Sequence, residues 1–238
     1  MENKRLLKVT DLAIGHEGRI LCSGISFDIC EGDCIMLCGA NGSGKTSLMK
    51  ALADKEETPC IRHESGCECI MIPARIPKVA GFTLREFVRI SCFSKSDLYG
   101  KLSKEEESAM DKAIADLRLT HLADRDISTL SDGEFQKAGI ASALVRKASV
   151  IMLDEPTAFL DAQNRISVLT TLKDICTSKR PGMLTGARVP AVIFSTHDLH
   201  DGLQACSKVF AIGADGSFNI STEDTPESKS AAVASIFR

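Results

Sequence analysis

A glycine-rich segment carries the strongest chemical signal in this sequence. Residues 39–46 match the pattern G-x-x-x-x-G-K-[ST] and lie between an apolar run and an amphipathic one. Glycines allow a backbone to curl so that several N–H groups point at phosphate oxygens, and the start of a helix adds the positive end of its dipole. We expect Lys45 to neutralise the β- and γ-phosphates, as a catalytic residue, and the Thr46 hydroxyl to bind Mg²⁺. The expected ATP-binding residues are Gly39, Ala40, Asn41, Gly42, Ser43, Gly44, Lys45, Thr46 and Ser47.

Two adjacent carboxylates supply a second signal. Asp154 and Glu155 directly follow the apolar run at 150–153. If that run is a strand of a parallel sheet, both carboxylates lie at its carboxyl edge, where ligands of such sheets bind. Asp154 is then positioned to hold Mg²⁺, and Glu155 to polarise the attacking water as a catalytic residue. Acidic residues are common after strands, so this prediction depends on the phosphate-binding segment elsewhere in the chain.

Hydrophobic periodicity predicts the strands that must position these groups. Apolar runs at 34–38, 150–153 and 191–194 are typical of strands buried on both faces of a parallel sheet. Residues 6–10 and 25–29 read as further short strands near the N-terminus. Strands of this kind, separated by helical segments, predict an α/β fold.

The helices follow from capping patterns and apolar spacing. We expect a helix from about residue 45 to 54 and a mostly helical block from about 83 to 146. Within that block, residues 83–86 and 103–106 fit the capping box that begins a helix. The last dozen residues, from about 225, fit either a short helix or a frayed tail.

Residues 131–134, Ser-Asp-Gly-Glu, admit two interpretations. As Ser-x-x-Glu they form a capping box at the start of an amphipathic helix. They also follow Leu130 and precede the Asp154–Glu155 pair, and the order of these parts resembles the ABC ATPase family. The signature loop of that family usually reads Leu-Ser-Gly-Gly-Gln. Here Asp132 and Glu134 replace Gly and Gln, a variation associated with some importers of iron complexes and cobalamin.

The resemblance extends from about residue 7 to 212 and implies a fold. It implies a P-loop NTPase with a RecA-like parallel-sheet core, a small antiparallel β subdomain and an inserted helical subdomain. Residues 1–238 would form a single ABC ATPase domain. Its core would comprise 1–73 and 147–238, and its helical subdomain about 74–146.

The resemblance also implies roles for particular residues. Asp161, in the segment 157–161, matches the D-loop that crosses the dimer interface, and His197 matches the switch histidine, a catalytic residue. The family pairs two subunits head to tail with ATP between them. Ser131, Asp132, Gly133 and Glu134 would then face the ATP of the partner subunit, with Ser131 and the Gly133 N–H contacting the γ-phosphate. The implied assembly is a homodimer that closes on ATP and Mg²⁺.

The sequence is compatible with three functions. The first is the ATP-hydrolysing subunit of a transporter that works through separate integral membrane permease subunits. The helical block, with Gly100, Leu102 and residues 121–125, resembles importers of an iron-siderophore, haem or cobalamin. The second is a soluble ABC ATPase for assembly or remodelling, such as iron–sulfur cluster delivery, without a permease. The third is a nucleotide sensor that dimerises but barely hydrolyses ATP.

Two positions depart from the family pattern. Ala74 stands where the Q-loop glutamine is expected, and alanine cannot ligate a metal. Either Arg75 or water substitutes for the missing amide, or hydrolysis is slower and less tightly linked to transport. His16 stands where an adenine-stacking aromatic residue is expected, and its imidazole ring offers less area than tyrosine would.

Composition narrows the location and the partners. A net charge of −3, from 29 basic and 32 acidic residues, gives no electrostatic footprint for nucleic acid. No apolar stretch approaches the ~20 residues that span a bilayer, so we expect no direct membrane insertion. The N-terminus lacks an apolar signal core. We expect a cytoplasmic protein, peripheral on the cytoplasmic face of the inner or plasma membrane.

Ten cysteines are many for this length. Without a secretion signal they indicate reduced thiols rather than a disulfide framework. Cys60, His63, Cys67 and Cys69 could in principle supply four ligands to zinc. Cys69 begins an apolar run whose alternate residues should point to opposite faces of a strand, so we favour thiols in a loop and a strand.

Overall fold

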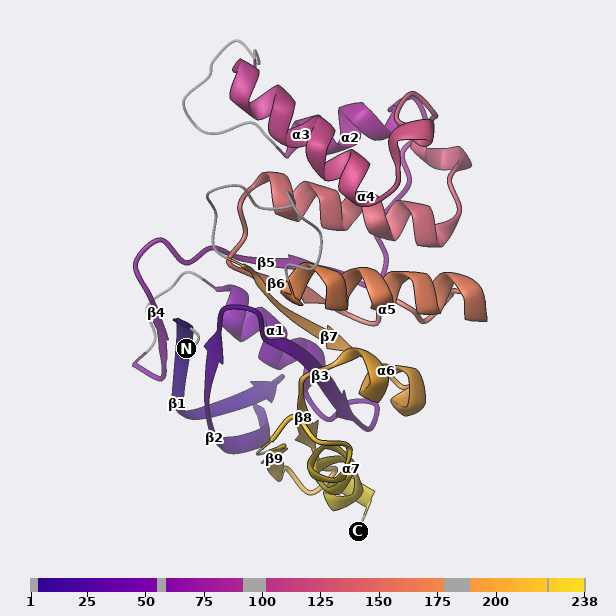
Figure 1. The fold of residues 1–238 in the computed structure, drawn as a ribbon. Helices are drawn as coiled ribbons and strands as arrows, with labels where there is room; N and C mark the ends of the chain where they lie inside the picture. Colours follow the sequence, from indigo (N-terminus) through magenta and orange to yellow (C-terminus); the bar gives the residue numbers. More distant parts are fainter. Residues whose placement is uncertain (1–3, 55–58, 92–101, 178–188, 222, 238) are drawn as a thin grey trace.

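The computed structural model describes residues 4–54, 59–91, 102–177, 189–221 and 223–237. Its centre is a six-stranded sheet in the order β5-β6-β7-β3-β8-β9 (Figure 1). The five strands from β5 to β8 pair in parallel, and β9 pairs antiparallel with β8 at the edge. These strands are β3 (Cys34–Gly39), β5 (Cys69–Ile72), β6 (Val150–Leu153), β7 (Ala191–Ser195), β8 (Lys208–Ile212) and β9 (Phe218–Ile220).

The apolar runs form central strands because both faces of the sheet are covered. Every residue of β6 and β7 is buried. Alternate residues of β3 enter different cores, with Met36 in the cluster beneath the large helices and Ile35 and Leu37 in the cluster beneath α1 (Lys45–Ala53). The predicted α/β class and parallel-sheet core are therefore confirmed.

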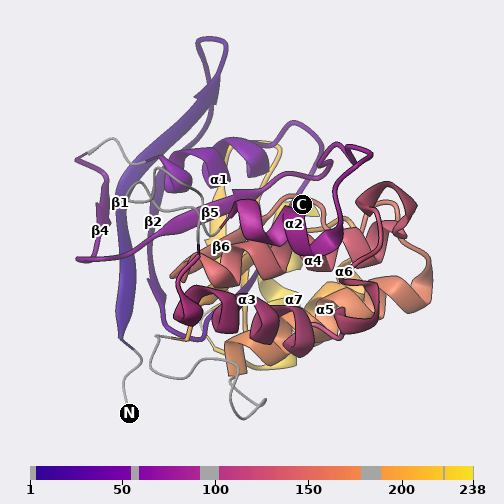
Figure 2. The same ribbon diagram turned by 90° about the horizontal axis from the view of Figure 1, so that it is seen from above.

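A second, antiparallel sheet lies beside the first, in the order β2-β1-β4. It contains β1 (Arg5–His16), β2 (Arg19–Cys30) and the short β4 (Ile61–His63). Seen from above, the long β1–β2 hairpin runs along one side of the molecule, away from the helical block (Figure 2). This sheet agrees with the antiparallel β subdomain that the resemblance implies.

Helices cover the two faces of the central sheet. Helix α1 buries Leu48, Met49 and Leu52 in the same cluster as the hairpin. Helices α4 (Asp132–Val145) and α5 (Ala162–Thr177) run side by side on the other face, and α2 (Leu84–Ile90) and α3 (Lys104–Asp116) stack on α4 (Figure 1). The remaining helical elements are α6 (Leu199–Ala205), α7 (Pro226–Ala234) and the 3₁₀ turns Thr120–Leu122, Ile127–Thr129 and Ser235–Phe237.

The helix starts follow the predicted capping boxes. Thr83, Ser103 and Ser131 each accept a hydrogen bond from the backbone N–H three residues on, and the glutamate at that position bonds back. Of the two alternatives for the C-terminus, the helix is confirmed, because α7 begins after Thr225. Gly100, which belongs to the resemblance to importers, lies outside the described residues.

The predicted N-terminal strands were too short. Residues 6–10 and 25–29 are only parts of β1 and β2, which have 12 residues each. Their pairing shifts register at several points, and Asp11, within β1, has a positive φ angle of 49°. These irregularities interrupt the alternation of apolar and polar residues by which a strand is recognised. The proposed boundaries of core and helical subdomain stay a prediction.

Within the described part of the chain, no helix is both long and apolar enough to cross a membrane.

Candidate functional site

The order of the strands gathers the predicted site from distant parts of the sequence. β7 lies between β3 and β6, and β6 lies beside β5. The register pairs Leu37 with Ser195 and Leu153 with Phe194. The segments that follow these strands therefore meet at one edge of the sheet, as parallel strands require.

The phosphate loop, residues 39–46, has a backbone that favours glycine. Gly42 and Gly44 have φ angles of 77° and 108°, which side chains rarely tolerate. A Cβ on Gly44 would lie 2.8 Å from Ile14 Cδ1, and a Cβ on Gly39 would lie 2.6 Å from the Ile212 carbonyl oxygen. The curl of this loop therefore depends on its glycines, as the sequence predicts.

Lys45 is held inside this curl. Its side chain is buried, and Nζ donates to the carbonyl oxygens of Gly39 at 2.9 Å and Ala40 at 3.0 Å. Burial lowers the pKa of Lys45, while the nearby Glu155 and Asp154 act to raise it. A buried ammonium with carbonyl partners is a strong site for an anion.

Ser43 provides a test of whether the loop fits a phosphate. Ser43 is 8% exposed, and its Oγ is buried without a hydrogen-bond partner among the described residues. A buried hydroxyl left unpaired costs free energy, which an oxyanion acceptor would recover. The unpaired hydroxyl and the buried ammonium of Lys45 both suit a phosphate.

A chain of hydrogen bonds joins the phosphate loop to the acidic pair. Thr46 Oγ1 donates to Asp154 Oδ2 at 2.6 Å, and Ser195 Oγ donates to Asp154 Oδ1 at 2.8 Å. The Glu155 N–H in turn donates to Ser195 Oγ at 2.7 Å. The hydroxyl of Thr46 and the carboxylate of Asp154 are oxygen ligands of the kind that Mg²⁺ prefers, so these two residues fit the predicted metal.

Glu155 and His197 lie together at the same edge. His197 Nε2 is 2.8 Å from Glu155 Oε1, and both residues border a small cavity of about 160 Å³. Glu155 has a φ of 47°, an unusual backbone conformation for a residue with a side chain. Strained backbone of this kind is concentrated at functional sites.

The signature loop, residues 131–134, is organised differently. The Glu134 carboxylate accepts both the N–H and the hydroxyl of Ser131, each at 2.8 Å. Partial burial acts to raise the pKa of Glu134, but the bonds from Ser131 outweigh it and the pKa is lowered. Asp132 pairs with Lys78 at 2.7 Å. These contacts satisfy the loop locally, and no hydrogen bond joins it to the phosphate loop in the described part of the chain.

The start of α5 packs directly against this loop. A Cβ on Gly133 would lie 3.2 Å from the side chain of Asn164. Asp161 in turn accepts hydrogen bonds from the N–H and side-chain amide of Asn164, at 2.8 Å and 3.0 Å. Asp161 and the signature loop therefore share one neighbour.

His16 lies at the end of β1, and its side chain is 72% exposed. Two residues earlier, Ile14 approaches Gly44, so this end of the hairpin lies beside the phosphate loop. That position is compatible with contact to a nucleotide base. Its adenine-stacking role stays a prediction.

The four candidate zinc ligands do not form one cluster among the described residues. His63 Nε2 lies 3.2 Å from the Leu52 carbonyl oxygen, and Cys60 Sγ donates to the Asp11 carbonyl oxygen. Cys67 and Cys69 have sulfur atoms 4.0 Å apart. In the described residues, no group of three or more His, Cys, Asp or Glu side chains is arranged to hold a metal.

The sequence pattern did not predict the roles of Ser195 and Arg165. Ser195 joins Asp154 to the backbone of Glu155, and Arg165 forms an ion pair with Asp198 in the loop that follows His197. A hydroxyl at the end of an apolar strand was the available signal for Ser195. Arg165 gave no signal, because its partner is 33 residues away.

The chain is similar to known proteins along most of its length. A family model described as ABC transporter matches residues 22–158. The ferric enterobactin transport ATP-binding protein FepC of Escherichia coli (strain K12) is 27% identical over 225 residues, covering 89% of this chain and 79% of that protein. The zinc import ATP-binding protein ZnuC of Rhizobium etli is 27% identical over 231 residues, covering 96% and 67%.

Solved structures agree on the fold. An ATP-binding cassette of an ABC transporter, in its ADP conformation, superposes with a TM-score of 0.80 at 16% identity, covering 98% of this chain and 97% of that one. The family model spans more than half of the sequence. The chain therefore belongs to the ABC transporter family and is an ATP-binding ATPase of that family.

Proposed function

We propose that this chain is the ATP-hydrolysing subunit of an importer and acts through separate integral membrane permease subunits. The observation that carries the proposal is the connected edge of the sheet, in which Thr46, Asp154, Ser195, Glu155 and His197 form one hydrogen-bonded chain beside Lys45. This arrangement supports hydrolysis rather than nucleotide sensing alone. Ala74 does not remove the carboxylate and histidine on which the chemistry depends.

ATP binding begins with Lys45. Phosphate oxygens replace the carbonyl partners of its ammonium group, and the unpaired Ser43 hydroxyl gains an acceptor. Thr46 and Asp154 would hold Mg²⁺, which would supply positive charge against the phosphates. The glycine backbone contributes N–H donors at the start of α1.

Hydrolysis then depends on the orientation of Glu155. Its carboxylate accepts a hydrogen bond from the attacking water while His197 holds the other side of the group. The water oxygen bonds to the γ-phosphorus as the bond to the bridging oxygen breaks, which yields ADP and phosphate. Ser195 fixes the backbone of Glu155 throughout.

The signature loop completes the site of a second copy. Ser131 is exposed and caps α4, so the start of this helix reaches the surface. A homodimer closed on two ATP molecules would use both loops. Asp161, next to Asn164, lies at the same face and would cross the interface.

The relatives whose names give a cargo include importers of metal-containing solutes and importers of aliphatic sulfonates. FepC is named for ferric enterobactin and ZnuC for zinc. We propose an iron-siderophore, haem or cobalamin as the imported solute, and a location peripheral to the cytoplasmic face of the inner or plasma membrane. The rival function, a soluble ATPase for iron–sulfur cluster delivery, gains nothing from Cys38 and Cys206, because burial raises the pKa of Cys38 to about 11 and of Cys206 to about 12.

Phosphate release by the purified chain tests the chemistry. Glu155→Gln should reduce the rate by about 100-fold or more and retain ATP binding, because only the water-orienting carboxylate is lost. Glu227→Gln, at an exposed position on α7, controls for loss of a carboxylate. A Glu155→Gln protein that hydrolyses at the wild-type rate would contradict the assignment. Purification from native membranes, with identification of a co-purifying polytopic protein, tests the transporter role.

A further inference from the structure

Three sulfur-containing side chains lie on one face of β5 and of the segment that leads into it. They belong to Cys67, Cys69 and Met71, which alternate with other residue types in the sequence. All three pack against the cluster beneath α1, whereas Ile70 and Ile72 belong with the cluster beneath the large helices. This division follows from the pleat, because alternate residues of an extended chain point to opposite faces. We call Cys67, Cys69 and Met71 the sulfur face.

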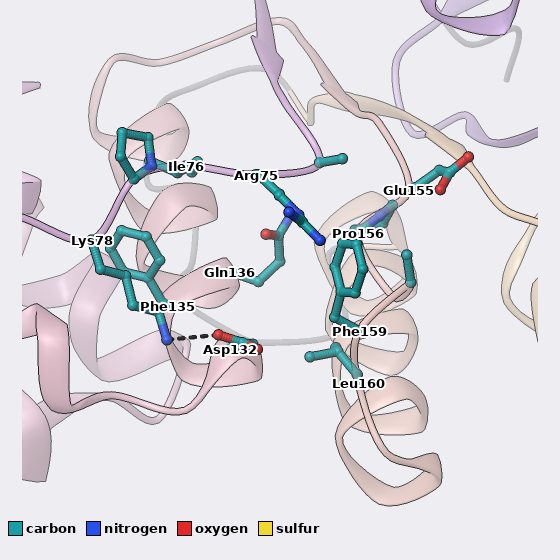
Figure 3. A pocket seen from close by; sticks show the side chains of 13 residues that line it. Arg75, Ile76, Lys78, Asp132, Phe135, Gln136, Glu155, Pro156, Phe159 and Leu160 are labelled. Atoms are coloured by element: carbon teal, nitrogen blue, oxygen red, sulfur yellow. Dashed lines mark hydrogen bonds and ion pairs between the residues drawn. The ribbon is translucent and has the colours of Figure 1, made fainter.

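The sulfur face is open to solvent and separate from the nucleotide site. β5 is the end strand of the central sheet, and all three residues are half-buried rather than buried. None of them lines the cavity of about 590 Å³ that is bordered by residues 74–78 and 155–160 (Figure 3). None of them lines the small cavity beside His197. A ligand of the sulfur face would therefore occupy a site of its own.

The backbone holds the two cysteines in a fixed relation. The turn at 64–67 is closed by a hydrogen bond from the Cys67 N–H, at 2.9 Å. Glu68, between the cysteines, is anchored on its own side, because its carbonyl oxygen accepts the Ser149 N–H at 2.7 Å and its carboxylate pairs with Arg146 at 2.6 Å. These contacts fix the residue from which both thiols diverge. Such preorganisation lowers the entropic cost of binding a ligand.

The distance between the thiols favours a metal ion over a disulfide. The Sγ atoms of Cys67 and Cys69 are 4.0 Å apart. A disulfide requires about 2.05 Å between its sulfur atoms. A bond of about 2.3 Å between zinc and a thiolate is typical, and two bonds of this length can join sulfur atoms up to about 4.6 Å apart. One ion can therefore bind both thiolates without movement of the backbone.

The ligand types indicate which ion would bind. Thiolate and thioether sulfur atoms are soft ligands, of the kind that Cu(I) prefers. Zinc in a structural site takes four ligands. In the described part of the chain, no group of three or more His, Cys, Asp or Glu side chains is arranged to hold a metal. Two thiolates with a thioether on the same face therefore suit a soft monovalent ion better than they suit zinc.

We propose that the sulfur face binds one Cu(I) ion. Cys67 and Cys69 bind the ion as thiolates, each losing its proton to solvent, and the Met71 thioether is the third ligand. The ion keeps its oxidation state, so binding consumes neither an oxidant nor a reductant. The inference goes beyond the proposed function and does not depend on it, because Cu(I) binding is measured without nucleotide.

Protection from alkylation tests the proposal in the wild-type chain, without any substitution. The reduced, nucleotide-free protein is treated anaerobically with iodoacetamide, with and without an equimolar amount of Cu(I), and mass spectrometry quantifies the labelled peptides. Cu(I) should slow the labelling of Cys67 and Cys69 by about tenfold or more, because a metal-bound thiolate is no longer a free nucleophile. Cys30, a half-buried thiol on β2, should be labelled at the same rate in both samples. Equal labelling of Cys67 and Cys69 with and without Cu(I) would overturn the proposal.

Competition with the chelator bicinchoninate measures the affinity for Cu(I). Once one thiolate holds the ion, the second binds intramolecularly, so Cys67→Ser and Cys69→Ser should each weaken binding by about 100-fold or more. Met71→Leu conserves volume, so the melting temperature should change little while Cu(I) binding weakens several-fold. Cys30→Ser should bind Cu(I) like the wild type.

Three results would contradict the assignment. Wild-type affinity for Cu(I) in Cys69→Ser would show that the ion binds elsewhere. X-ray absorption at the copper edge should show sulfur neighbours alone, and nitrogen or oxygen neighbours would exclude the sulfur face as the site. Displacement of Cu(I) by an equal concentration of Zn(II) would assign the face to zinc instead.

Discussion

The edge that holds Lys45 and Glu155 differs from the signature loop in how its polar groups are satisfied. At the edge, hydrogen bonds connect Asp154, Glu155 and Ser195, at the ends of two neighbouring strands, with Thr46 of the phosphate loop. The Ser43 hydroxyl has no partner among the described residues. In the signature loop, Ser131 and Glu134 satisfy one another, and Ser131 is exposed. The first region is organised to receive a ligand within its own chain. In the second, the capping hydrogen bonds lie within the loop, and its exposed surface is accessible to another chain.

This difference predicts different sensitivities to substitution. A connected network transmits the loss of one member to the others, since each group orients the next. A local capping box affects mainly the helix that it begins. Substitutions at the edge should therefore lower the rate of ATP hydrolysis with little change in the free energy of unfolding. Conservative substitutions in the signature loop should lower the free energy of unfolding with little change in the rate.

Lys45→Ala should have the largest effect. It removes the buried ammonium from a curl that is closed around it, and ATP binding and hydrolysis should fall by about 100-fold or more. Isothermal titration with ATP and a phosphate-release assay measure the two losses. Lys50→Ala, at an exposed position on α1, should bind ATP like the wild type. Equal affinities of the two variants for ATP would contradict the assignment of Lys45 to the phosphate site.

His197→Ala should reduce turnover while preserving binding. The imidazole bonds to Glu155 at 2.8 Å, and in the described residues it forms no hydrogen bond with the phosphate loop. We expect a fall of about 100-fold in kcat with little change in the affinity for ATP. His200→Ala, exposed on α6, provides the matched control. Unaltered turnover would return His197 to the status of a surface residue.

Ser195→Ala should have a smaller effect, because Ser195 acts through its neighbours. It removes two hydrogen bonds, one to Asp154 and one from the Glu155 N–H. A fall of about tenfold in kcat, with KM for ATP nearly unchanged, is the expected result for a positioning residue. Rescue by Ser195→Thr would support the role of the hydroxyl, and equal falls in both Ser195 variants would oppose it.

Glu134→Gln should have the smallest effect and should act on stability. The amide keeps an acceptor for Ser131 but loses the charge at the start of α4, which costs about 0.5 kcal/mol. Because the pKa of Glu134 is lowered in the folded chain, its contribution is present above the usual pKa of 4.5 and is lost as the pH falls through the folded value. Urea denaturation at neutral and acid pH should show a difference between the variant and the wild type only at neutral pH.

The strands and helix starts that depend only on neighbouring residues could be predicted from the sequence. β3, β6 and β7 were recognised because residues buried on both faces read as continuous apolar runs. The capping boxes were recognised because both partners lie within four residues. The phosphate loop and the acidic pair were located from their positions next to these strands.

The remaining features depend on strand order and backbone conformation. Ser195 bridges Asp154 and Glu155 only because β7 is adjacent to β6. Arg75 contacts the ring of Phe159, which is 84 positions later in the sequence, and no local pattern predicts that contact. The irregular register of β1 and β2 likewise follows from turns at single residues, such as Asp11.

Mixing two inactive variants tests the central claim most directly. Lys45→Ala disables the phosphate loop of every chain that carries it, and Ser131→Arg obstructs the signature loop of every chain that carries it. A homodimer of either variant therefore has a defect in both sites and should be inactive. In a head-to-tail dimer, a mixed pair keeps one site in which both loops are wild type, and the mixture should recover up to about a quarter of the wild-type rate of phosphate release. A mixture that stays as inactive as its components would contradict the claim that two chains share each ATP.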